Sequence, residues 1–180
     1  MNVAVGTLLD PAAAAHEDAT TRVNAWRGRC LASFARAEMA VSEALLSLAA
    51  TREDIALPHM FGQRVTALRS AVANRDEGRE LEAALAAFAM RLPLRVFLTH
   101  GDVQVTVDRN GRWQVVLTVL ALKHGGGERS FLVVDEEEAQ EIARALGRDR
   151  QRLVTRLVQW RTTSPAKAEL IGLRAGTIRR

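Results

Sequence analysis

The stretch Arg91-Leu-Pro-Leu-Arg-Val-Phe-Leu-Thr-His-Gly101 decides the fold, because the spacing of apolar residues changes directly after it. Before Gly101 the apolar residues recur at helical spacing. After it, valines alternate with polar residues over 102–107, and Asp108-Arg-Asn-Gly111 is a two-residue hairpin signal. The sequence therefore predicts a helix that ends at Gly101 and a β-hairpin that follows at once.

Three amphipathic helices are predicted before this change. The first runs from Thr21 to about Ala50, the second from Phe61 to Asn74, and the third begins near Arg79. Their apolar stripes consist of Trp26, Cys30, Phe34, Val41, Leu45 and Leu48, then Phe61, Val65, Leu68 and Val72, then Leu81, Leu85, Phe88, Leu92 and Val96. Pro93 falls inside the third helix and predicts a kink near Ala89–Leu92. Gly101 is expected at the C′ position with a positive φ.

Two more strands and one helix are predicted after the hairpin turn. The strands are Trp113–Leu122 and Ser130–Val134, joined by a turn over 123–128. Asp135 is expected to cap a last helix with the apolar stripe Ile142, Leu146, Leu153, Leu157 and Trp160. Glu136, Glu137 and Glu138 suit the positive end of that helix.

The predicted fold is mainly α: an up-and-down four-helix bundle with a small antiparallel β-meander between the third and fourth helices (α+β). A loose N-terminal arm is expected over 1–20, a single domain over 21–161 with its β insertion at 102–134, and a basic tail over 162–180. A length of 180 residues with 48% hydrophobic content suffices for one buried core.

The net charge of +4 comes entirely from the C-terminal end. Residues 1–160 carry 20 basic and 20 acidic side chains, whereas 161–180 carry five basic residues (Arg161, Lys167, Arg174, Arg179, Arg180) against Glu169, and 5 − 1 = 4. Such a tail either follows a phosphate backbone non-specifically or solubilises the chain, and both interpretations remain open.

The composition also indicates the compartment. No apolar run approaches the roughly 18 residues of a membrane helix, and the N-terminus has no basic region typical of a signal peptide. The single Cys30 has no partner for an internal disulfide. We therefore expect a cytoplasmic protein with no membrane partner.

Most enzyme motifs are absent from the sequence. There is no Walker loop, no Gly-x-Gly-x-x-Gly after a strand and no Gly-x-Ser-x-Gly elbow. His16, His59, His100 and His124 are scattered, without the spacing of metal ligands. No cofactor or metal is expected. Trp26, Trp113 and Trp160 are predicted to anchor the core or an interface rather than to stack on bases.

Arg95 and His100 form the one candidate catalytic pair. Histidine acts as both acid and base near neutral pH, and the arginine guanidinium is suited to clamping phosphate. The two side chains could therefore form a minimal, metal-free site that cleaves phosphodiesters.

Arg95-Val-Phe-Leu-Thr-His100-Gly101, before a β insertion and a last helix, resembles the Arg-x(4–6)-His motif of the HEPN superfamily. The resemblance covers about 21–161, mostly through the order of elements. It implies a metal-independent endoribonuclease of a defence or toxin–antitoxin system, with RNA as substrate and an antitoxin as partner. It also implies an active site at a homodimer interface, where His100 would transfer protons and Arg95 would hold the phosphate.

Two alternatives to a nuclease remain open. The chain could be a non-catalytic HEPN-like module for dimerisation or partner binding, in which Arg95 pairs with an acidic neighbour and His100 caps the helix end. Five residues on a straight helix separate two side chains by about 140°, so the Pro93 kink, the length of arginine or the terminal position of His100 would have to bring the pair together. The other alternative is nucleic-acid binding through the tail.

Overall fold

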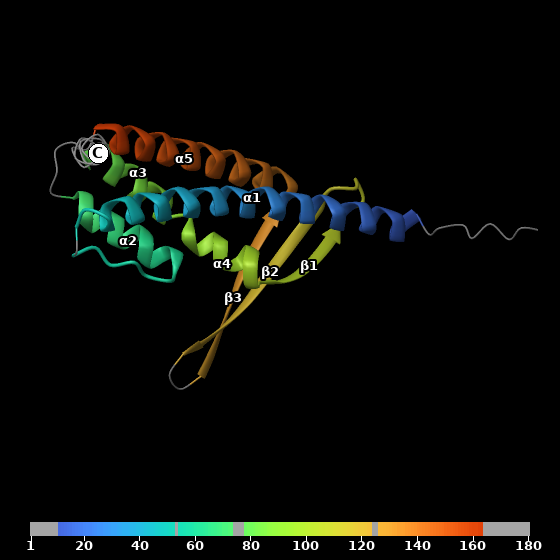
Figure 1. Cartoon of the computed structure of the whole chain (residues 1–180). Helices are drawn as coiled ribbons and strands as arrows, with labels where there is room; N and C mark the ends of the chain where they lie inside the picture. Colours follow the sequence, from blue (N-terminus) through green and yellow to red (C-terminus); the bar gives the residue numbers. More distant parts are fainter. Residues whose placement is uncertain (1–10, 53, 74–77, 124–125, 164–180) are drawn as a thin grey trace, which may run out of the picture. The chain divides into compact units, whose positions relative to one another are not determined.

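The computed structural model describes residues 11–52, 54–73, 78–123 and 126–163 (Figure 1). Its helices are α1 (Pro11–Ala49), α2 (Phe61–Val72), α3 (Arg79–Ala89), α4 (Leu92–His100) and α5 (Glu136–Thr163). Its strands are β1 (Asp102–Val107), β2 (Trp113–Lys123) and β3 (Gly126–Asp135). The prediction of a mainly helical chain with a small antiparallel meander before the last helix is confirmed. Among the helices described, none combines the length and apolarity needed to cross a bilayer.

The chain comprises two compact units, each built from two separate segments. Unit 1 comprises Met1–Leu31 and Leu94–Arg144, which include the first part of α1, most of α4, the sheet and the start of α5. Unit 2 comprises Ala32–Pro93 and Ala145–Arg180, which include the rest of α1, helices α2 and α3, and the rest of α5. The candidate residues Arg95 and His100 both belong to unit 1.

The sheet of unit 1 is an antiparallel meander in the order β1-β2-β3. β1 pairs with the first part of β2, from Val107↔Trp113 to Asp102↔Thr118. β3 pairs with almost all of β2, from Gln114↔Asp135 to Lys123↔Gly126. Within the described sheet, β2 beyond Thr118 therefore pairs with β3 alone, and the β2–β3 hairpin runs on past the start of β1 (Figure 1).

One face of this sheet, which we call the inner face, packs on helices of unit 1. Its buried residues are Trp113, Val115, Leu117 and Val134. The ring of Trp26 in α1 lies 6.1 Å from the ring of Trp113, centroid to centroid, and Cys30 of α1 is also buried. The Nη2 of Arg27 donates to the carbonyl of Leu98 at 2.8 Å, which ties α1 to α4. Alternation along the strands leaves the opposite side chains on a second face.

Unit 2 is a helical core built around three phenylalanines. Phe88 of α3 lies 5.7 Å from Phe34 of α1 and 6.2 Å from Phe61 of α2, between ring centroids. The predicted stripes of the first two helices are buried throughout: Trp26, Cys30, Phe34, Val41, Leu45, Leu48, Phe61, Val65, Leu68 and Val72. In the last helix Leu146, Leu153, Leu157 and Trp160 are buried and Ile142 is half-buried. The helical periodicity therefore predicted the buried stripes of the first, second and last helices.

The first helix begins earlier than predicted. α1 starts at Pro11, so the expectation of a loose arm over 1–20 is wrong for residues 11–20, while 1–10 lie outside the described residues. Proline is well suited to the first helical position, and the following run Ala12–Ala15 has the highest intrinsic helix propensity. The predicted basic tail 162–180 lies almost wholly outside the described residues, although Thr162 and Thr163 end α5.

The third predicted helix is broken rather than kinked. α3 ends at Ala89 and α4 begins at Leu92, with the N–H of Arg91 donating to the carbonyl of Phe88 at 2.9 Å in between. Pro93 is the second residue of α4, where its missing N–H would have no helical partner in any case. Because the helix is broken here, the apolar stripe of α3 does not continue along α4 as predicted. Val96 is therefore 46% exposed instead of buried.

The turns of the sheet also differ from the prediction. β3 begins at Gly126, because the glycines and Glu128, expected in a turn, continue the ladder with β2. The first hairpin loop is longer than two residues: the N–H of Asp108 donates to the carbonyl of Arg112, and Gly111 supplies the positive φ of 74°. Gly101 has no such φ, which corrects the predicted C′ conformation.

Candidate functional site

Arg95 and His100 lie on one uninterrupted helix. α4 continues to its last residue, His100, and the N–H of Gly101 still donates to the carbonyl of Phe97 at 2.9 Å. Five helical residues turn the chain by about 500°, which leaves the two side chains about 140° apart. Pro93 precedes both residues, so its effect on the helix cannot reduce this angle.

The two side chains also differ in their surroundings. Arg95 is half-buried and has an interaction within the structure, whereas His100 is exposed at the helix end. The carbonyl of Arg95 accepts from the Oγ1 of Thr99 at 2.7 Å. His100 is the basic residue in the last turn of α4, where a positive charge suits the helix dipole. These positions agree with the non-catalytic alternative for the pair.

His100 instead borders a hollow on the second face of the sheet. The hollow has a volume of about 520 Å³, and its lining within the described residues includes Asp102, Gln104, Arg129 and Phe131, but not Arg95. The structure thus brings His100 together with a carboxylate and a guanidinium from the strands. A proton-transfer group beside a cation can act on a phosphate, although Asp102 would repel that phosphate.

Arg129 was missed as a candidate because the third strand was predicted to begin too late. From sequence, the turn was expected over 123–128 and the strand from Ser130, so Arg129 was assigned to neither. Strand register would have found Arg129: Leu120 lies opposite Arg129 and Thr118 opposite Phe131, so alternate β3 residues share the face of the hollow. The register could be assigned only if β3 was known to start at Gly126. The glycine run predicted a turn there instead of a strand.

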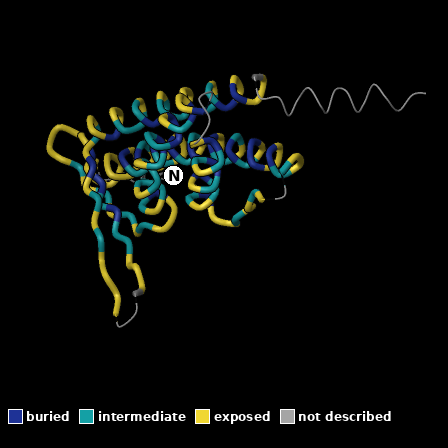
Figure 2. The backbone as a smooth tube through the Cα atoms, turned by 90° about the vertical axis from the view of Figure 1, so that its left-hand side faces the viewer, coloured by how far each residue is buried: buried dark blue, intermediate teal, exposed yellow. Residues whose placement is uncertain are grey.

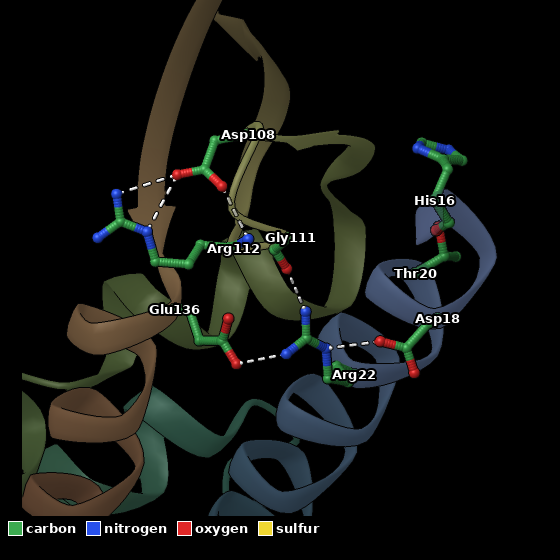
Figure 3. A network of polar contacts seen from close by, with 8 residues as sticks. All are labelled: His16, Asp18, Thr20, Arg22, Asp108, Gly111, Arg112 and Glu136. Atoms are coloured by element: carbon green, nitrogen blue, oxygen red, sulfur yellow. Dashed lines mark hydrogen bonds and ion pairs between the residues drawn. The ribbon is translucent and has the colours of Figure 1, made fainter. Parts of the chain in front are cut away.

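A second polar cluster in unit 1 surrounds Arg22 of α1 (Figure 3). The Nη1 of Arg22 donates to the Oε1 of Glu136 at 2.9 Å, and its Nη2 donates to the carbonyl of Gly111 at 2.8 Å. Its Nε lies 3.2 Å from the Oδ2 of Asp18. One guanidinium therefore joins α1, the first hairpin loop and the start of α5, which indicates a structural role.

The hollow beside this cluster is acidic, and three of its carboxylates already accept hydrogen bonds within the structure. It has a volume of about 460 Å³ and is lined by residues that include Asp108, Asp135 and Glu136. Asp108 accepts from the backbone N–H of Arg112 and of Asn110, and these hydrogen bonds, with the guanidinium of Arg112, lower the pKa of its carboxyl. Asp135 caps α5 and Glu136 binds Arg22. Among the described residues, no group of three or more ligand side chains could hold a metal.

Cys30 and the other described histidines do not form a candidate site. Burial raises the pKa of the Cys30 thiol to about 11, so the thiolate is scarce at neutral pH. His16 and His59 are exposed on α1 and in the loop before α2. The remaining histidine, His124, lies outside the described residues.

The second face of the sheet, which we call the outer face, is polar along β1 and carries exposed apolar side chains on β2 and β3. The exposed apolar residues are Leu120 and Leu122 of β2, which are 56% and 83% exposed, and Phe131 and Val133 of β3, which are 62% and 50% exposed. Val116 lies opposite Val133 and half-buried beside them. In Figure 2 much of the β2–β3 hairpin toward its tip is coloured yellow, for exposed residues. Such a contiguous apolar surface is typical of a protein interaction site.

Comparisons with protein-family models, curated proteins and solved structures gave no match. The resemblance to the HEPN superfamily therefore rests on the motif Arg95–His100 and on the order of the elements.

Proposed function

We propose that this chain is a HEPN-like, non-catalytic dimerisation module whose partner is a second copy of itself. The observation that carries the proposal is the exposed apolar outer face, with Phe131 and Val133 on the edge strand β3. The proposal includes an up-and-down arrangement of the helices, as in the HEPN bundle. Unlike the family's nuclease arrangement, this association needs no converging Arg95 and His100.

The edge of β3 supports association because its segment 130–134 carries no charge. In the described sheet β3 pairs with β2 on one side only, and its ten residues offer backbone groups on the other. The segment Ser130-Phe-Leu-Val-Val134 carries no charge and no proline. Natural edge strands normally carry charges, prolines or bulges that prevent pairing with another chain. The absence of these protections over 130–134 supports the pairing of this segment with another strand.

A second copy fits this edge because the strand complements itself. Most homo-oligomers are twofold symmetric, so the same patch on each copy must meet itself. β3 carries Arg129 and, at its end, Asp135, and the residues between them are Ser130 and the apolar run 131–134. Two antiparallel copies therefore bring unlike charges together at both ends and apolar side chains together in the middle.

The test compares two valines of similar exposure in the full chain. Val133 on the outer face is 50% exposed and Val158 on α5 is 55% exposed. We expect sedimentation equilibrium to give a dimer for the wild type and for Val158→Ser, and a dimer at least about fivefold weaker for Val133→Ser, because one side chain per copy loses apolar burial. A monomeric wild type, or equal weakening by both substitutions, would contradict the proposal.

The second candidate function is the metal-independent endoribonuclease. One observation favours it: His100 is exposed and borders a hollow together with Arg129. In this proposal His100 would transfer the proton of an attacking RNA 2′-hydroxyl, and a guanidinium would offset the charge that develops on the phosphate.

RNA cleavage in EDTA separates the two candidates. A nuclease would cleave RNA, and His100→Ala would lower the rate by about 10²-fold or more, the usual contribution of a positioned proton-transfer group. The dimerisation module predicts equal residual cleavage by the wild type and by His100→Ala, as expected from a contaminant. Loss of cleavage in His100→Ala alone would refute the non-catalytic proposal.

A further inference from the structure

Resting on the proposed dimer, we infer the register in which two β3 strands pair: antiparallel, with the twofold axis at Leu132. The two three-stranded sheets then form one continuous sheet of six strands. The residues Arg129–Asp135 on one copy thereby acquire defined opposite residues on the other.

Symmetry and backbone geometry allow few registers. Directly opposed residues in an antiparallel pair must both direct their backbone groups toward the partner or both away from it. Backbone direction alternates along a strand, so residues of even number oppose even ones and odd residues oppose odd ones. The twofold axis therefore passes midway between one residue of β3 and the same residue of the second copy. The register is fixed once that residue is identified.

Side-chain complementarity selects Leu132 among these residues. With the axis there, Arg129 lies opposite Asp135 of the second copy, and Phe131 lies opposite Val133 of the second copy, each twice by symmetry. An axis at Phe131 would instead oppose Arg129 to Val133. An axis at Val133 would oppose Phe131 to Asp135. Only the axis at Leu132 matches charge with charge and apolar with apolar along the outer face.

Asp135 can serve the partner while it caps α5. Its Oδ1 accepts from the N–H groups of Glu137 and Glu138 at 2.9 Å each. The cap uses this one oxygen, so Oδ2 can accept from Arg129 of the second copy. Arg129 is exposed and lines the hollow on the same face.

This register keeps the two His100 side chains apart. Five strand spacings separate β1 from its symmetry copy, or about 24 Å at 4.8 Å each. His100 lies two residues before the start of β1, so the two histidines do not share one cleft in this arrangement. This dimer is therefore different from an arrangement in which two Arg95 and His100 pairs meet.

Disulfide cross-linking of the full chain tests the register. In Leu132→Cys the two cysteines oppose each other across the axis, with Cα atoms about 5 Å apart and within disulfide reach. In Ser130→Cys, on the same face, they are offset by four residues, or about 14 Å. We expect mild oxidation to give covalent dimer from Leu132→Cys and little from Ser130→Cys. Cys30 is buried and serves as the unchanged background.

Charge variants give a second readout that does not depend on oxidation. Arg129→Glu places two carboxylates together at both ends, and we expect a dissociation constant about tenfold higher or more. Arg109→Glu makes the same change in the exposed first hairpin loop and should leave the constant unchanged. Asp135→Asn keeps a good helix cap but removes the charge, so it should weaken the dimer several-fold.

The outcomes separate this inference from the proposed function. A wild-type dimer in which Ser130→Cys cross-links as well as Leu132→Cys, or in which Arg129→Glu matches Arg109→Glu, overturns the register and leaves the dimerisation proposal standing. A monomeric wild type overturns both.

Discussion

At the residue scale, Gly101 shows why a residue type can be predicted for the wrong reason. The local sequence predicts a positive φ there, but Gly111 is the glycine with that conformation among the described residues. A Cβ at Gly101 would lie 2.4 Å from the carbonyl oxygen of Phe97 and 3.3 Å from the Cβ of Leu117. The carbonyl of Phe97, one turn earlier in α4, therefore requires glycine here, and Leu117 of the sheet adds a further tight contact that local sequence does not reveal.

Gly101→Ala should destabilise the fold, while Gly147→Ala should stabilise it. The backbone must shift to admit the methyl group at Gly101, at a cost of about 1–3 kcal/mol. Gly147 lies inside α5, and a methyl group added there would meet nothing within 4 Å, so alanine should add about 0.5–1 kcal/mol of stability. Urea unfolding of both variants measures these changes, and a Gly101→Ala protein as stable as wild type would disprove the crowding.

The candidate pair illustrates a second limit at this scale. Arg95 and His100 could be found from sequence because they are close along the chain, and their helix was predicted. Arg129 and Asp102, which share the hollow with His100, come from strands whose register decides which side chains meet. Register depends on where each strand ends, and a glycine run leaves that end unspecified.

At the scale of elements, apolar periodicity predicted the helices, whereas their ends depended on proline. The same rule that proline interrupts a helix predicted a kink at Ala89–Leu92, and the structure has a break there. Sequence cannot distinguish the two outcomes, because the choice depends on tertiary partners such as the ion pair between the Nε of Arg91 and the Oδ2 of Asp149, at 2.8 Å. Pro11 had the opposite effect and begins α1.

Arg22→Ala tests how strongly α1 is joined to the loop and to α5. The substitution removes the part-buried ion pair with Glu136, the ion pair with Asp18 and the hydrogen bond to the carbonyl of Gly111. Because the guanidinium is 39% exposed, solvent screening limits the expected loss to about 1–2 kcal/mol. Arg36→Ala, on an exposed position of the same helix, should change stability by less than about 0.5 kcal/mol. Thermal or urea unfolding measures both losses of stability. Equal losses for Arg22→Ala and Arg36→Ala would contradict a structural role for Arg22.

At the scale of the whole molecule, the sequence predicted what each element buries but not which surface stays uncovered. The alternating valines of β1 and the apolar residues of β2 and β3 indicated a sheet with a buried face. They could not show that the outer face would remain exposed at Leu120, Phe131 and Val133, because both faces of β2 and β3 are apolar. That exposed face and the open edge of β3 define the central claim, association with a second copy.

Amide hydrogen exchange at two protein concentrations tests this claim most directly. The two edge strands, β1 and β3, serve as each other's control, because each has one unpaired side in the described sheet. We predict that raising the concentration through the dimer range slows exchange at Ser130–Val134 of β3 and leaves β1 unchanged. Exchange in β3 that does not depend on concentration, or new protection confined to the helices, would contradict association through this edge.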